Sequence, residues 1–330
     1  MQGGADVLVV GEAASDGSLR PVSWEIFTPA RQIADASGGK VVALFVGAGI
    51  ADAARSWATA GADRLLIGDD PRLEGVMPAA AATVLTQAIA QMQPTVVLVP
   101  GTTAGRDYAP LVAARLGTGL AADCVEFAVA DGALTATRPV LGGRALSRIR
   151  FLGEGPAMAT VRSGSFAKTA PGVSQPDVET LNVTLEPAAL RVSLVETTPK
   201  GSGVSRLDSA DIVVSGGRGL GKPEQFALVD ELAAALGGAV GATRAVVDAG
   251  WRPHQEQIGQ TGRTVSPKLY VAIGISGAVQ HNVGMQGAET IVAVNRDPDA
   301  PIFKIASFGI VGDLFEVVPA LTAEVRNVKG

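Results

Sequence analysis

The stretch LYVAIGISGAVQHNVGMQGAETIVAVN, residues 269–295, decides the fold of the C-terminal half of this chain. An apolar run ends at Ser276 and Gly277, a short segment with helical spacing follows, and a second apolar run ends at Asn295. Near-continuous runs of Val, Ile and Ala joined by a helix are typical of parallel strands that are buried on both faces. Polar groups that could hold a ligand, His281 among them, lie where each strand stops. Ligands of parallel sheets bind at this end of the strands.

The same alternation of short apolar runs and helical segments extends along most of the chain. In the first half it predicts strands at 7–12, 40–49, 64–70 and 95–101, and helices at 24–37, 51–62 and 78–92. In the second half it predicts strands at 210–217, 239–247, 268–275, 290–295 and 301–307, and helices at 223–238 and 313–325. We therefore predict an α/β protein of two domains, each a mostly parallel sheet with helices on both faces. The N-terminal domain is expected to be Rossmann-like and the C-terminal domain doubly wound.

The middle of the chain departs from this pattern. The pair Asp131-Gly132 lies between alternating runs in residues 123–140, which predicts an antiparallel hairpin. Strand-like segments follow at 157–166 and 190–198.

Residues 197–210, TTPKGSGVSRLDSA, are rich in Ser, Gly and Thr and lack apolar periodicity. Such a composition is typical of a linker. We therefore expect an N-terminal domain of residues 1–199 and a C-terminal domain of residues 200–330. A simple connection and a hinge both fit this linker.

Composition narrows the classes of function. A net charge of -5 gives no electrostatic footprint for nucleic acid. The charge-free residues 75–105 contain Pro78 and Pro94, which favours a buried helix and strand over a membrane segment. Cys124, the single cysteine, is expected to be a buried small residue and suits a reducing compartment. The N-terminus lacks a signal or transit pattern, so a cytoplasmic location is expected, although a mature mitochondrial matrix protein would fit equally.

Polar residues at the predicted strand ends of the C-terminal half form one candidate cofactor site. Each is a weak signal alone, since GRGLG is only part of a dinucleotide-binding fingerprint and Ser276 or Asp313 could simply cap a helix. Helix N-termini predicted at Pro223 and after Ser276 would offer backbone N–H groups to a pyrophosphate. We find no metal-ligand spacing and no nucleophile–base pair here, so we predict a binding site with neither catalytic residues nor a metal. The candidates are Arg218, Arg244, Gln257, Gln260, Thr261, Ser276, Gln280, His281, Asn295 and Asp313.

Five segments of the C-terminal half together resemble the α subunit of the electron-transfer flavoproteins, the ETF α or FixB family. They are SGGRGL, GATRAVVDAG, QIGQTG, LYVAIGISGAVQH and IVAVNRDPDAPIFKIASFGIVGDLF. In the first half, GTTAGRDYAPLVAARLGTGLAADC is similar to the N-terminal domain of that family. The resemblance implies that the C-terminal domain binds FAD, with the flavin ring in a cleft that faces a β subunit.

The resemblance also implies a role for each candidate residue. Arg218 and Ser276 would face the pyrophosphate, while Arg244 would lie against the isoalloxazine ring. Thr261 would hydrogen-bond N5, and His281 would donate to the N1/O2 edge, where negative charge collects when one electron is added. Because a fixed cation outweighs one neutral hydrogen bond, Arg244 is expected to govern the reduction potential more than Thr261. The remaining members line the ring region (Gln257, Gln260 and Gln280) or hold the ribose and adenine end (Asn295 and Asp313).

Two positions depart from the family pattern. Thr243 stands where Ser is common and keeps the hydroxyl, so it joins the predicted cofactor-binding residues. Phe308 stands where Tyr is common, and we expect any effect to fall on the adenine pocket.

As a member of this family, the chain would be an electron carrier rather than an enzyme. It would form a heterodimer with a β subunit that holds AMP or, in bifurcating forms, a second FAD, and its N-terminal domain would pack on that subunit. Electrons would come from acyl-CoA dehydrogenases of fatty acid β-oxidation and from other flavoprotein dehydrogenases, and would pass to a flavoprotein quinone oxidoreductase. The strand-end segment GTTAGRDYAPLV could be structural or could hold a ligand of its own.

Three alternatives stay open at this point. The chain could belong to a specialised form that serves electron bifurcation or nitrogen fixation. It could be an NAD-dependent α/β enzyme, or a nucleotide-binding regulator without redox chemistry. A flavin spectrum would separate the first of these from the other two.

Overall fold

The computed structural model describes residues 6–13, 18–75, 77–141, 143, 145–170, 172–196, 207 and 210–329. The chain divides into two compact units, Met1–Thr197 and Thr198–Gly330. Apart from residues 207 and 210, the predicted linker at 197–210 lies outside the described residues.

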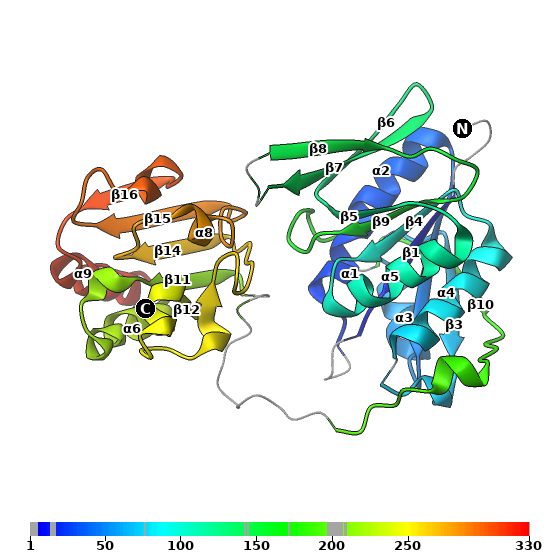
Figure 1. Ribbon diagram of the computed structural model, residues 1–330, viewed down its shortest axis with the longest axis horizontal. Helices are drawn as coiled ribbons and strands as arrows, with labels where there is room; N and C mark the ends of the chain where they lie inside the picture. Colours follow the sequence, from blue (N-terminus) through cyan, green and yellow to red (C-terminus); the bar gives the residue numbers. More distant parts are fainter. Residues whose placement is uncertain are drawn as a thin grey trace. The chain divides into compact units, whose positions relative to one another are not determined.

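The N-terminal unit is built on a seven-stranded parallel sheet in the order β10-β3-β2-β1-β4-β9-β5. The strands are β1 (Val7–Gly11), β2 (Val41–Gly47), β3 (Arg64–Asp69), β4 (Val96–Pro100), β5 (Leu120–Cys124), β9 (Ala157–Val161) and β10 (Asp177–Thr180). The chain winds outward from β1 through β2 to β3 and then crosses to β4 on the other side of β1 (Figure 1). The topological switch point therefore lies between β1 and β4.

Helices cover both faces of this sheet, as the sequence predicts. One core contains Val7 and Val9 of β1 with α1 (Pro21–Glu25), α2 (Phe27–Ser37) and α3 (Ala51–Ala58). The other contains Leu8 and Val10 with α4 (Pro78–Met92) and α5 (Thr103–Leu116). The charge-free stretch is thus a buried helix and strand, and no helix among the described residues has the length and apolarity needed to cross a membrane. Cys124 is fully buried, as predicted.

A three-stranded antiparallel sheet is formed by β6 (Glu126–Ala130), β7 (Ala133–Val140) and β8 (Ala145–Arg150). The predicted hairpin is confirmed, with Asp131 and Gly132 both at positive φ (51° and 70°). This pair of left-handed residues is what a tight hairpin turn requires.

The predicted strand at 190–198 is wrong for its described residues. Residues 187–190 form a 3₁₀ turn and 191–196 form no strand. The apolar side chains of Val192, Leu194 and Val195 are 63%, 53% and 94% exposed, so they are not packed into the face of a sheet. The sheet edge beside β3 is instead occupied by β10, a polar segment that the apolar pattern could not indicate.

The C-terminal unit contains a six-stranded parallel sheet in the order β13-β12-β11-β14-β15-β16. Numbered from β11, this is the 3-2-1-4-5-6 order of the doubly wound dinucleotide-binding fold, with its switch point between β11 and β14. The strands are β11 (Ile212–Gly216), β12 (Ala239–Thr243), β13 (Gln257–Ile258), β14 (Leu269–Ile273), β15 (Thr290–Asn295) and β16 (Phe308–Val311).

Helices α6 (Ala227–Leu236) and α9 (Leu314–Lys329) pack side by side and contribute to one core of this unit (Figure 1). The core on the opposite face contains Tyr270, Met285 and Ile302 beneath short segments that include α8 (Val279–Asn282). The two-domain α/β architecture predicted from the sequence is therefore confirmed.

Two predicted strands need correction. The strand predicted at 239–247 ends at Thr243, and α7 (Arg244–Asp248) begins at the next residue. Val246 is buried on this helix, so the apolar residues after Thr243 belong to a helix and not to a strand. The strand at 301–307 is a 3₁₀ turn at Pro301–Lys304, and the edge strand β16 follows it. The N–H of Ile302 bonds the carbonyl of Ser276 (3.0 Å), so it joins two loops instead of a strand ladder.

Candidate cofactor site

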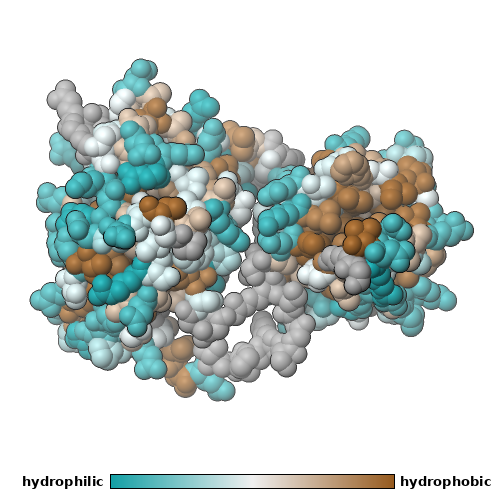
Figure 2. All heavy atoms as spheres, turned by 180° about the vertical axis from the view of Figure 1, so that it is seen from behind, coloured by the Kyte–Doolittle hydropathy of each residue, from teal (hydrophilic) through white to brown (hydrophobic). Residues whose placement is uncertain are grey.

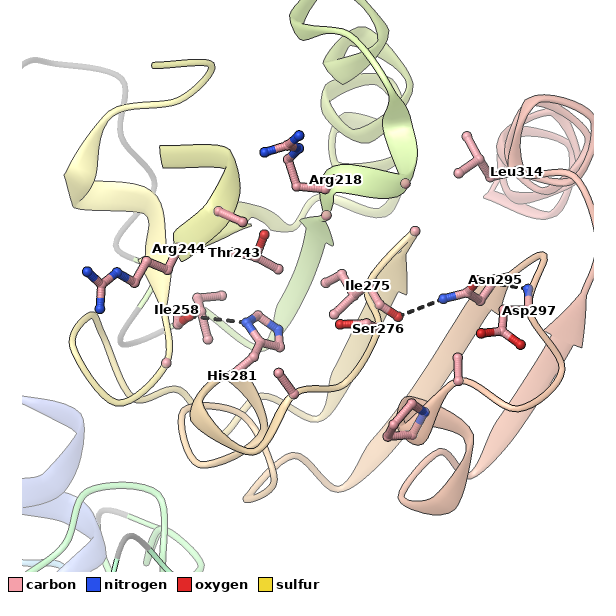
Figure 3. Close-up of a pocket in the computed structure, with 18 of the residues that line it drawn as sticks. Arg218, Thr243, Arg244, Ile258, Ile275, Ser276, His281, Asn295, Asp297 and Leu314 are labelled. Atoms are coloured by element: carbon pink, nitrogen blue, oxygen red, sulfur yellow. Dashed lines mark hydrogen bonds between the residues drawn. The ribbon is translucent and has the colours of Figure 1, made fainter. Parts of the chain in front are cut away.

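A cavity of about 820 Å³ lies at the carboxyl ends of the strands of the C-terminal sheet. Loops that follow β11, β12, β13, β14, β15 and β16 form its wall (Figure 3). This is the position at which doubly wound sheets bind their ligands. Ten of the predicted residues line it: Arg218, Thr243, Arg244, Gln260, Thr261, Ser276, Gln280, His281, Asn295 and Asp313. Gln257 does not line the cavity; it lies behind Thr261.

Glycines bring the loops after β11 and β14 into backbone contact at the switch point. A Cβ on Gly217 would lie 2.3 Å from the carbonyl oxygen of Gly274, and one on Gly219 would lie 2.7 Å from the same oxygen. Side chains are therefore excluded at both positions, and the turn after β11 stays open to the cavity.

The predicted helix start at Pro223 lies outside the cavity wall and opens a 3₁₀ turn. The helix after Ser276 is only four residues long, too short for an appreciable dipole.

Three arginines, Arg218, Arg244 and Arg296, give the wall its positive charge. The guanidinium carbon of Arg218 lies 5.7 Å from the ring centroid of Trp251, within the range of a cation–π contact. Arg244 Nε lies 3.1 Å from Asp248 Oδ2, and both side chains are mostly exposed (66% and 61%). Figure 3 shows that Arg218 and Arg244 come from separate elements, the turn after β11 and the helix α7.

His281 is buried in the wall and neutral. Its Nδ1 lies 3.2 Å from the carbonyl oxygen of Ile258, and its Nε2 lies 2.9 Å from the hydroxyl of Tyr270. Because a carbonyl oxygen only accepts, Nδ1 carries the proton and Nε2 accepts from Tyr270. Burial lowers the pKa of His281 to about 4. Both ring nitrogens are thus engaged within the protein, and donation to a ligand requires that Nδ1–H exchange the Ile258 carbonyl for it.

Asn295 and Asp313 build the wall as well as facing the cavity. Asn295 Nδ2 donates to the Ile275 carbonyl (2.9 Å), and its Oδ1 accepts from the Asp297 N–H (3.0 Å), as the dashed lines in Figure 3 mark. Asp313 Oδ1 accepts from the Phe315 N–H (2.8 Å) at the start of α9, so the capping interpretation of Asp313 is confirmed. Each side chain keeps further hydrogen-bonding capacity for a ligand.

Ser276 does not cap a helix, since the N-cap residue of α8 is Ala278. Its side chain is exposed at the cavity wall, where the hydroxyl can reach a ligand.

Several wall residues were not predicted from the sequence. Ile258, Ile275, Leu314 and Phe315 supply apolar surface, while Asp248 and Asp297 supply carboxylates. Ile258, Ile275 and Leu314 are each next to a predicted polar residue in the sequence, and this adjacency is the one signal that could have found them. Phe308 is 65% exposed on β16 and is not part of the cavity wall, so its departure from the family pattern does not reach the cavity.

At the switch point of the N-terminal sheet, side chains from the two strand ends hydrogen-bond to each other. Glu12 follows β1, and its carboxylate accepts from the hydroxyls of Thr102 (2.6 Å) and Tyr108 (2.9 Å). Thr102 follows β4 and caps α5 through its Oγ1, which accepts from the Gly105 N–H (2.9 Å). Burial raises the pKa of Glu12, and these two hydrogen bonds oppose that effect. The strand ends of this unit are therefore joined to each other by a buried carboxylate.

Comparison with known families defines the class first. Residues 7–186 match the model of the electron transfer flavoprotein domain. Residues 206–286 match the model of the electron transfer flavoprotein FAD-binding domain. The C-terminal unit with its switch-point cavity is thus an FAD-binding domain, and the protein is an electron carrier.

Full-length relatives identify the family more narrowly. The electron transfer flavoprotein subunit alpha of Thermoanaerobacterium thermosaccharolyticum is 40% identical, with 98% of each chain covered. That of Megasphaera elsdenii is 42% identical over 96% of this chain and 95% of its own. The protein FixB of Clostridium saccharobutylicum is 40% identical over 95% of this chain and 94% of its own. The chain belongs to the electron transfer flavoprotein α-subunit family.

Proposed function

We propose that the cavity between the ends of β11 and β14 holds FAD and that this chain is the FAD-bearing subunit of a two-subunit electron carrier. The observation that carries this proposal is the switch-point cavity itself, whose wall combines three exposed arginines with strand-end hydroxyls. Bound FAD would supply reversible uptake and release of electrons, while the protein sets its orientation and electrostatic surroundings.

The residues fit the pyrophosphate end of such a cofactor. Arg218 has a planar set of N–H donors that matches phosphate oxygens, and its contact with Trp251 restrains the guanidinium. The exposed hydroxyl of Ser276 and the open turn at Gly217–Gly219 lie on the same wall. In our proposal Arg218 and Ser276 hold the pyrophosphate.

The opposite part of the wall fits the flavin ring. Arg244 supplies a fixed positive charge, Thr261 a hydroxyl, and His281 a neutral imidazole. The N–H of Gln260 bonds the carbonyl of Gln280 (2.7 Å) and so ties the turn after β13 to α8. We propose that these residues, with Thr243, orient the ring and favour negative charge on it. Asn295 and Asp313 would hold the ribose and adenine end, beside the apolar surfaces of Leu314 and Phe315.

A second subunit is part of the proposal, and relatives of this chain are named as subunits. Figure 2 shows hydrophobic surface gathered on the displayed face of the C-terminal unit. In the N-terminal unit, Leu141, Leu146 and Leu152 are 70%, 67% and 83% exposed in or beside the antiparallel sheet. Exposed apolar surface of this kind marks protein interfaces, which supports packing of the N-terminal domain on a β subunit that carries AMP or a second FAD.

The electron donors and the acceptor complete the proposal. Acyl-CoA dehydrogenases and other flavoprotein dehydrogenases would reduce the carrier, which would pass electrons to a flavoprotein quinone oxidoreductase.

We also propose a cytoplasmic location, which the thiol of the buried Cys124 suits. We also propose a domain boundary in the 197–210 linker, which the division between Thr197 and Thr198 supports.

A specialised electron carrier is the second candidate, because the similar chain from Clostridium saccharobutylicum is named FixB. The amount of FAD bound to the purified heterodimer separates the two forms. One FAD with AMP supports the general carrier, and two FAD support a bifurcating form.

The proposal is tested by producing the chain together with its β subunit and measuring FAD by absorbance and extraction. We expect FAD in the wild-type complex and a loss of most of it in Arg218→Ala. The matched control is Lys222→Ala, an exposed cation four residues along the chain and outside the cavity wall. A colourless wild-type complex, or full retention of FAD in Arg218→Ala, would contradict the proposed site.

A further inference from the structure

Gln257 is buried, 4% exposed, and does not line the cavity as the described residues form it. It lies on β13, and its side-chain Nε2 donates to Thr261 Oγ1 at 3.0 Å. Thr261, in contrast, is exposed at the cavity wall. Gln257 therefore reaches the cavity only through the hydroxyl of Thr261.

The turn between these residues is fixed by its backbone. The Gly262 N–H bonds the Gly259 carbonyl (3.0 Å), and the Arg263 N–H bonds the Gln257 carbonyl (2.7 Å). A Cβ on Gly262 would lie 2.3 Å from that same Gln257 carbonyl oxygen, so only glycine closes the turn this tightly. With the backbone held, rotation of the Thr261 side chain and its hydroxyl hydrogen is the main freedom left.

Gln257 removes that freedom. A threonine hydroxyl has one O–H and two lone pairs. The Gln257 amide occupies one lone pair of Thr261 Oγ1, which leaves the O–H to be donated elsewhere. The exposed side of Thr261 is the cavity, so a ligand there can accept from the hydroxyl.

We propose that Gln257 is a positioning residue that sets the Thr261 hydroxyl as a hydrogen-bond donor into the cavity. This inference rests on the proposed function of the cavity as the FAD site, where an unprotonated ring nitrogen would accept the bond. The cofactor then depends on a side chain that it does not touch.

The test is a double-mutant cycle on the FAD-loaded complex with the β subunit. Gln257→Met keeps the volume of the side chain and removes the amide, while Thr261→Val removes the hydroxyl. We expect each single variant to weaken FAD binding about fivefold, as the loss of one neutral hydrogen bond would. The double variant should bind FAD no more weakly than Thr261→Val alone, because Gln257 acts through that hydroxyl.

Two controls separate positioning from a general structural effect. Thr261→Ser keeps the hydroxyl and should restore most of the FAD affinity that Thr261→Val loses. Gln286→Met, at an exposed glutamine outside the cavity wall, should change neither. Wild-type affinity in Gln257→Met, or fully additive losses in the double variant, would overturn the inference. Absence of FAD from the wild-type complex would instead overturn the proposed function.

Discussion

The two parallel sheets of this protein differ in how the polar groups at the carboxyl ends of their strands are used. In the C-terminal unit, the ends of β11 and β14 border a cavity whose wall presents the exposed Arg244 and Ser276. In the N-terminal unit, the ends of β1 and β4 are joined by the buried Glu12 carboxylate, which accepts from Thr102 and Tyr108. A switch point thus provides a place for a ligand, but a ligand can bind only where the strand-end polar groups have not satisfied each other.

The largest expected effect comes from removing the Glu12 carboxylate, which joins the ends of β1 and β4 in the N-terminal sheet. Glu12→Ala leaves the buried hydroxyl of Tyr108 and the half-buried hydroxyl of Thr102 without their acceptor, so we expect it to lower the free energy of unfolding by about 3 kcal/mol. Denaturant unfolding of the FAD-loaded complex measures this, and FAD content should stay unchanged. Glu154→Ala, at an exposed glutamate, is the matched control. Unaltered stability would show that the carboxylate does not hold the strand ends together.

A pH-dependent effect of similar size should come from the cavity wall. Burial lowers the pKa of His281 to about 4, below the unfolded value near 6.5. As pH falls, the unfolded state therefore takes up the proton first. The free energy of unfolding should decrease by on the order of 3 kcal/mol between pH 6.5 and about 4. Measuring the free energy of unfolding of His281→Gln and of wild type at several pH values isolates the contribution of His281 to this pH dependence. His254→Gln, at the exposed second histidine, should keep it; an unchanged slope in His281→Gln would mean that His281 is not buried as a neutral ring.

A smaller effect should appear in the reduction potential of bound FAD. Arg244→Ala removes a cation from the cavity wall, which should lower the first reduction potential because negative charge on the ring loses support. The side chain is 66% exposed, so we expect about 1 kcal/mol, which is about 40 mV for one electron. Spectroelectrochemical titration measures the shift, which should shrink at high salt. Arg326→Ala, exposed and outside the cavity wall, is the control.

The smallest effect should have the opposite sign. Asp248 pairs with Arg244 and also lines the cavity, so its carboxylate offsets part of the positive charge. Asp248→Asn should raise the first potential by about 20 mV, corresponding to about 0.5 kcal/mol for an exposed pair. A shift in the same direction as that of Arg244→Ala would show that Asp248 acts by orienting Arg244 and not through its charge.

The sequence by itself determined the architecture and indicated most of the polar residues of one cavity wall. The spacing of apolar residues and the Gly and Pro residues at the ends of elements are local features of the sequence. They therefore predicted both parallel sheets and the hairpin at Asp131-Gly132. The rule that ligands bind at strand ends then collected ten residues that line one cavity. The same patterns failed at β10, whose polar residues carry no apolar signal, and at residue 244, where a strand gives way to a helix.

Only the tertiary structure decided what each polar residue does. Gln257 lies behind Thr261, and Asp313 caps α9 while facing the cavity. His281 is neutral because the fold buries it beside Tyr270 and the carbonyl of Ile258. Burial and hydrogen-bond partners come from segments far apart in the chain, and no local pattern of residues encodes which of them will meet.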